Sequence, residues 1–106
     1  MVGEFRTDLE PVVIRAEAEI LKNVRTVVPD GRLERIGPID FGTPEWSCWI
    51  VTPTDRERDR VAGDNELLER LYKAAADAGF APDSITVQSQ ETVDRDHEGS
   101  WFLVMR

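Results

Sequence analysis

The chain has very few of the residues that carry redox, metal and nucleophilic chemistry. Its 106 residues include one cysteine, Cys48, and one histidine, His97. One cysteine excludes an internal disulfide, and one thiol and one imidazole far apart in sequence do not form a zinc motif. The sequence also has no GxGxxG, GxxxxGK[ST], HExxH or GxSxG pattern. We therefore predict no metal, no cofactor and no catalytic residue.

Long apolar runs are missing as well. No run approaches the roughly 20 residues that a helix needs to cross a bilayer. The first residues, MVGEFR, lack the basic and then apolar order of a secretory signal. We expect no membrane association and a cytoplasmic location. The length fits a single domain covering residues 1–106.

Basic residues are in the minority. Lys and Arg total 13 against 21 Asp and Glu, which gives a net charge of −8. This balance opposes binding to the phosphate backbone of nucleic acids, whose affinity comes largely from Lys and Arg. The most basic stretch, residues 54–60, alternates arginines with acidic residues, so the charges cancel and the segment is expected to be solvated, either as a short helical turn or as an irregular loop. The acidic surface instead favours basic partners.

Two segments have the period of a helix. Residues 7–28 carry one apolar stripe at Leu9, Val13, Ala16, Ile20, Val24 and Val27. We expect this helix to begin near Pro11, because proline suits a first helical turn; a capping box at 7–10 is the alternative start. The second helix is predicted at 64–78, with Asp64 as its cap and Gly79 just beyond its end.

Strand patterns fill most of the remainder. They cover residues 33–41, 46–52, 85–91 and 100–105, with a hairpin turn at 42–45. The order αββαββ predicts an α+β fold with two layers, in which two helices cover one face of a four-stranded, mainly antiparallel sheet. If the helices cover the Ile85 side, Thr86, Gln88 and Gln90 belong to the opposite side, which also carries at least one tryptophan.

The acidic connection at 92–99 holds the densest group of polar side chains. Asp94–Gly99 resembles the opening of an EF-hand calcium loop, in which alternate acidic residues supply oxygens and a glycine permits a sharp turn. Glu98 replaces the usual Asp or Asn, and the twelfth position, normally a bidentate glutamate, is Met105. We interpret the segment as a solvated hairpin loop. His97 lies among acidic residues in this loop, and we do not expect it to act as a general base.

The candidate binding residues combine the exposed sheet face with this loop. They are Trp49, Gln88, Gln90, Glu91, Asp94, Asp96, Glu98 and Trp101. Aromatic and amide side chains on an open face are typical of a partner surface or a ligand site. Cys48, inside an apolar run, is expected to be a buried thiol.

The sequence favours a small, acidic, non-enzymatic module that contacts a protein partner. An inhibitor of the immunity or antitoxin type, whose acidic groups cover a basic active surface, is one concrete version. A small-molecule-binding domain or enzyme with a pocket lined by Trp49, Gln88, Gln90 and Trp101 is the first alternative. A homodimer that buries the open face is the second.

Overall fold

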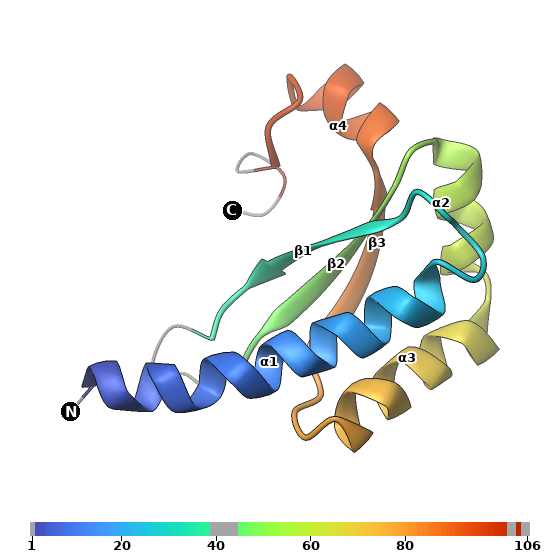
Figure 1. Cartoon of the computed structure of the whole chain (residues 1–106). Coiled ribbons are helices and arrows are strands. Elements are labelled where there is room, and N and C mark those ends of the chain that lie inside the picture. The colour runs from blue at the N-terminus through green and yellow to red at the C-terminus, as the bar shows by residue number, and fades with distance from the viewer. Residues whose placement is uncertain (1, 39–44, 102–103, 105–106) are drawn as a thin grey trace.

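The computed structural model describes residues 2–38, 45–101 and 104, with side chains from Glu10 onward. Within these ranges the chain forms four helices and a three-stranded sheet (Figure 1). In chain order they are α1 (Val2–Val24), β1 (Arg32–Ile36), β2 (Ser47–Thr52), α2 (Asp55–Ala62), α3 (Asn65–Asp77), β3 (Ser84–Ser89) and α4 (Gln90–Asp96).

The sheet is mixed, with strand order β1-β2-β3. β1 runs antiparallel to β2, with Leu33 opposite Ile50, and β3 runs parallel to β2, with Val87 opposite Ile50. The parallel pair follows from the connection after β2, because α2 and α3 together carry the chain back to the starting end of the sheet.

Helices α1 and α3 pack against one another on one face of the sheet (Figure 1). The hydrophobic core lies between this helical layer and the sheet. It includes Val13, Ala16, Ile20 and Val24 of α1, Leu67, Leu71 and Ala75 of α3, and Cys48 and Ile50 of β2. The apolar stripes that predicted the two helices therefore supply most of this core.

The α+β class is confirmed, but the predicted order αββαββ and four-stranded antiparallel sheet are wrong. One cause is residues 54–60, expected as a short helical turn or an irregular loop, because Thr54 caps a full helix, α2, that begins at Asp55. Thr54 Oγ1 accepts a hydrogen bond from the N–H of Glu57 at 3.3 Å, which caps the helix, and it donates one to Glu57 Oε1 at 2.9 Å. Val61 anchors the helix in the core.

The second cause lies at the end of the chain, where a fourth strand was predicted at 100–105. Ser89 Oγ accepts a hydrogen bond from the N–H of Thr92 at 3.0 Å, and this cap begins α4 directly after β3. The expected strand 85–91 thus ends at Ser89, and the acidic connection is largely helical. Trp101 and Val104 are also helical. Residues 102, 103 and 105 lie outside the described ranges.

Helix α1 begins at Val2, so the predicted start near Pro11 is wrong. Pro11 lies inside the helix on its exposed side, where its missing N–H leaves one intrahelical bond unmade. The first strand ends at Ile36, before Gly37, whose φ is +78°. The predicted continuation at 39–41 and most of the turn at 42–45 lie outside the described residues. No helix within those residues is long and apolar enough to cross a membrane.

Candidate functional site

The sheet face turned away from α1 and α3 is called the open face below. Residues that pair across neighbouring strands point to the same face of the sheet. Trp49 of β2 pairs with Glu34 of β1 and with Thr86 of β3, so these three side chains share one face. By the same register the open face carries Arg32, Glu34 and Ile36 of β1, Ser47, Trp49 and Val51 of β2, and Ser84, Thr86 and Gln88 of β3. Ile36 is 39% exposed there.

An aromatic cluster occupies part of the open face. The rings of Trp49 and Trp101 meet edge to face, with centroids 6.1 Å apart and an interplanar angle of 75°. The Arg32 guanidinium lies 5.6 Å from the centroid of the Trp101 ring, within the range of a cation–π contact. Gln90 Oε1 accepts hydrogen bonds from Trp101 Nε1, at 2.8 Å, and from Arg32. We call Arg32, Trp49, Gln90 and Trp101 the tryptophan cluster.

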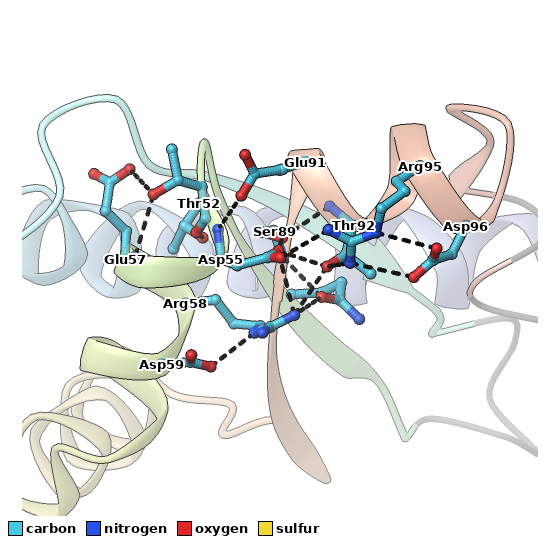
Figure 2. A network of polar contacts seen from close by, with 12 residues as sticks. Thr52, Asp55, Glu57, Arg58, Asp59, Ser89, Glu91, Thr92, Arg95 and Asp96 are labelled. Atoms are coloured by element: carbon cyan, nitrogen blue, oxygen red, sulfur yellow. Dashed lines mark hydrogen bonds and ion pairs between the residues drawn. The ribbon is translucent and has the colours of Figure 1, made fainter.

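A polar network, called the Asp55 network, joins the first turn of α2 to the end of β3 and to α4 (Figure 2). Thr92 Oγ1 donates to Asp55 Oδ1 at 2.5 Å, and Ser89 Oγ donates to the same oxygen. Arg95 Nη1 donates to Asp55 Oδ2 at 3.1 Å, and Arg58 Nη1 lies 3.4 Å from Oδ1. The carboxylate therefore holds hydroxyls and guanidiniums from three elements.

The hydroxyl of Thr92 uses its full bonding capacity in this network. Besides donating to Asp55, it accepts hydrogen bonds from Arg58 Nη1 at 2.9 Å and from Arg95 Nη2 at 3.1 Å. The hydrogen bonds from Ser89 and Thr92 lower the pKa of Asp55 far below its ordinary value, and the two guanidiniums act in the same direction. The network fixes α4 against α2.

Gln88 belongs to this network rather than to the tryptophan cluster. Its Oε1 accepts hydrogen bonds from Arg58 Nη1 at 3.1 Å and from the backbone N–H of Ser89 at 2.9 Å. Of the predicted pocket lining, the structure therefore brings together Trp49, Gln90 and Trp101, while Gln88 turns to α2.

The predicted acidic residues lie on α4 and the turn after it. Glu91, Asp94, Asp96 and Glu98 are all exposed. Three of them also accept hydrogen bonds within the chain. Their donors are the backbone N–H of Asp55 to Glu91 at 3.0 Å, Gln90 Nε2 to Asp94 at 2.8 Å, and Arg95 Nε to Asp96 at 3.2 Å. These bonds connect the acidic residues to the tryptophan cluster, through Gln90, and to the Asp55 network, through Asp55 and Arg95.

The likeness to a calcium loop does not extend to the structure. Asp94 and Asp96 lie within α4, where residues two apart do not face one another. Glu98 and Gly99, with φ of 54° and 74°, form the turn that follows. Within the described part of the chain, no group of three or more His, Cys, Asp or Glu side chains is arranged to hold a metal ion.

Cys48 is unsuited to nucleophilic chemistry. Its side chain is 1% exposed in the core, and burial, aided by the negative charge of Glu17, raises the pKa of its thiol to about 12. Cys48 lies near the start of β2, whereas His97 follows α4 beyond the end of β3, which is parallel to β2. The sheet therefore separates the two residues along its length.

A second ionic group lies between α1 and β1. Arg35 Nη2 donates to Glu10 Oε1 at 3.0 Å, and Arg35 Nη1 lies 3.4 Å from Glu17 Oε1. Burial raises the pKa of Glu17, although Arg35 opposes the change and Glu10 adds to it. Arg35 Nη1 is itself buried and makes no hydrogen bond to a described residue. The sequence reasoning missed this group, because it depends on how α1 lies over β1.

Sequence reasoning also missed the Asp55 network, although two local signals indicated its framework. Thr54 and Glu57 have the spacing of a capping box, and Ser89 has a hydroxyl suited to a helix cap. Neither signal shows that the two helix starts converge, since they are more than thirty residues apart.

The grooves that the described residues form do not lie on the open face. One, of about 450 Å³, runs between α1 and α3, on the helical side of the sheet. Its lining is Arg15, Ala18, Glu19, Ala74, Asp77 and Ala78. A comparison with protein-family models, curated proteins and solved structures finds no significant match to this chain.

Proposed function

We propose that this chain is a protein-binding module whose partner is a basic protein. The partner contacts the open face together with the acidic side chains of α4 and the turn after it. The observation that carries the proposal is the continuity of these two surfaces. Gln90 contacts Arg32 and Trp101 on the open face, and it also donates to Asp94 on α4.

The chemistry of this surface suits protein recognition. Aromatic and arginine side chains are the residue types most enriched among those that dominate binding energy at interfaces. Here Arg32, Trp49 and Trp101 are half-buried and held in place by mutual contacts, so little side-chain entropy remains to be lost on binding. Ile36 adds exposed apolar area on the same face.

The charge supports a basic partner. The chain carries a net charge of −8, and Glu91, Asp94, Asp96 and Glu98 are exposed around α4. A charged surface of this kind accelerates encounter with a partner of opposite sign and gives a rate of association that falls with salt. An inhibitor that covers the basic surface of a toxin or enzyme is the version of this function that we favour.

The test compares capture of a partner by three forms of the purified protein. One is the natural chain. The second carries Asp94→Asn, Asp96→Asn and Glu98→Gln on the proposed surface. The matched control carries Glu66→Gln, Glu69→Gln and Asp77→Asn, which removes the same charge from exposed positions of α3.

Each form is immobilised and exposed to lysate of its own source cells, and then washed with increasing salt. The proposal predicts one stoichiometric basic protein that elutes with salt from the natural chain and from the α3 control but is lost from the α4 variant. Equal capture by all three forms, or equal loss from both variants, would contradict a local acidic surface.

A further inference from the structure

The two edges of the sheet are not equivalent. At β3, the N–H of Ile85 donates to Tyr72 Oη at 2.8 Å, and the N–H of Ser89 donates to Gln88 Oε1 at 2.9 Å. Ile85 and Ser89 have the same parity along the strand, so both groups lie on the outer edge, where side chains occupy them. Within residues 2–38 and 45–101, no strand pairs with the outer edge of β1.

The register shows which backbone groups β1 presents at its edge. The N–H of Ile85 points outward, so the N–H and C=O of the next residue, Thr86, point toward β2. In a parallel pair the backbone groups of the opposite residue point away from the neighbouring strand, so those of Trp49 point toward β1. Trp49 is opposite Glu34, whose N–H and C=O therefore bond to β2. The backbone groups of Leu33 and Arg35 consequently point outward from β1. Outward-pointing groups of an edge strand are a template for another strand.

We propose that this edge binds β1 of a second copy of the chain, antiparallel, with Leu33 on the two-fold axis. Partners in an antiparallel pair share a face, so Arg32 of each copy stands opposite Glu34 of the other on the open face. Leu33 meets its own counterpart on the helical side, where it already packs against the core.

Charge selects this register over its neighbours. A pairing centred on Glu34 would set two carboxylates directly opposite one another, and a pairing centred on Arg35 would do the same with two guanidiniums. Like charges directly opposite are destabilising. If one β1 strand were shifted by one residue relative to the other, residues of the open face would stand opposite residues of the helical side. The alternation of side chains along a strand does not allow such a pairing.

The backbone geometry fits the same register. Leu33 and its counterpart exchange N–H and C=O bonds, and the N–H of each Arg35 reaches the carbonyl of Gly31 in the other copy. That carbonyl accepts one hydrogen bond already, from Arg25 Nε at 3.0 Å, and has a second lone pair. The intrachain Arg32–Glu34 ion pair, at 2.5 Å, becomes part of a square of alternating charges.

The dimer goes beyond the proposed function, because it depends on the backbone edge of β1 and needs no other protein. It joins the two sheets and sets the two open faces side by side. A bivalent surface raises the effective concentration for any partner with two sites.

Charge exchange across the axis tests the proposal with the purified full chain. The measurement is the mass by sedimentation equilibrium from low to high micromolar concentration. The natural chain is expected to dimerise. Arg32→Glu alone and Glu34→Arg alone each set like charges opposite one another, and each should weaken the dimer by about tenfold or more. The double variant restores opposite charges in the same register and should recover the dimer.

A mixture of the two single variants provides the second readout. Each copy then carries one sign of charge at both positions, and the mixed dimer has opposite charges in both pairs, so it should form where neither variant does alone. Arg70→Glu and Glu66→Arg on α3 carry the same charge changes away from β1 and should remain dimeric. Circular dichroism confirms that each form is folded. A natural chain that stays monomeric, or single variants that dimerise like it, would overturn the proposal.

Discussion

The hydroxyl of Thr92 lies 2.5 Å from Asp55 Oδ1 and joins α4 to the first turn of α2. This contact spans 37 residues of sequence and holds the acidic helix beside the sheet. The position of the proposed partner surface therefore depends on the Asp55 network.

Replacing Thr92 by valine keeps the shape of the side chain but removes its hydroxyl. Asp55 loses a donor, and Arg58 and Arg95 each lose an acceptor at a site that is 7% exposed. Because Thr92 makes hydrogen bonds to charged groups, but Asp55, Arg58 and Arg95 keep access to water, we expect a loss of about 1–2 kcal/mol in the free energy of unfolding. Urea denaturation measures it. Thr86→Val on the open face is the control, and an equal loss there would contradict a special role for the network.

Asp55→Asn should destabilise the protein at neutral pH, and the difference should shrink as the pH falls below the ordinary pKa of the carboxyl group. The folded-state pKa of Asp55 lies well below its ordinary value of 3.8, because Ser89 and Thr92 donate to the charged form. Its contribution is therefore complete above the unfolded pKa and is lost as the pH falls through the folded pKa.

The measurement for Asp55 is the difference in unfolding free energy between the natural chain and Asp55→Asn from pH 7 down to pH 2. Asp59→Asn on the same helix is the matched control, since the Asp59 side chain is 71% exposed and pairs with Arg58 alone in the described network. A difference for Asp55→Asn that stayed constant with pH would show that the carboxylate is not held in its charged form.

Glu17→Gln should behave in the opposite sense. Burial raises the folded-state pKa of Glu17 above its ordinary value of 4.5, so the stabilisation that this group gives is complete below that value and lost as the pH rises through the folded pKa. The natural chain should therefore lose stability relative to Glu17→Gln between pH 4 and pH 8. Thermal melting across this range measures the trend, with the exposed Glu19→Gln as control. A trend of the reverse sign would indicate that Arg35 outweighs burial.

Cys48 should resist thiol reagents in the folded protein. Its side chain is 1% exposed and its pKa is raised to about 12, so little thiolate forms at pH 8 and no reagent reaches it. Labelling with a disulfide reagent should be slow in buffer and complete in denaturant. Rapid labelling of the folded chain at pH 8 would show that this part of the core opens.

The sequence predicted the helical layer well because its apolar stripes are regular. The spacing of Val13, Ile20, Leu67 and Leu71 identified the residues of α1 and α3 that now form the core. It also placed Thr86 on the opposite face of the sheet together with at least one tryptophan, which the structure identifies as Trp49. In both cases a single period, helical or alternating, decides which side of an element is buried.

The errors came from segments where local bonding outweighs periodicity. The apolar run from Ser100 favoured a strand, yet Ser89 caps a helix that turns the chain away from the sheet. The alternating charges of 54–60 left a short helical turn and a loop as equal alternatives, because the capped helix α2 buries only Val61 and so has no apolar stripe. The Asp55 network forms because the first turns of α2 and α4 lie side by side in the fold. No local sequence pattern predicts that contact.

Site-specific photo-crosslinking tests the central claim most directly. A photoreactive amino acid is introduced at Thr86 on the open face, at Asp94 on α4 and, as a control, at the exposed Ala76 on α3. Each form is illuminated in lysate of the source cells, and adducts are resolved by mass. The account predicts one discrete adduct with a basic protein from Thr86 and Asp94, weakened by salt, and none from Ala76. An adduct from Ala76 alone, or none from any position, would contradict it.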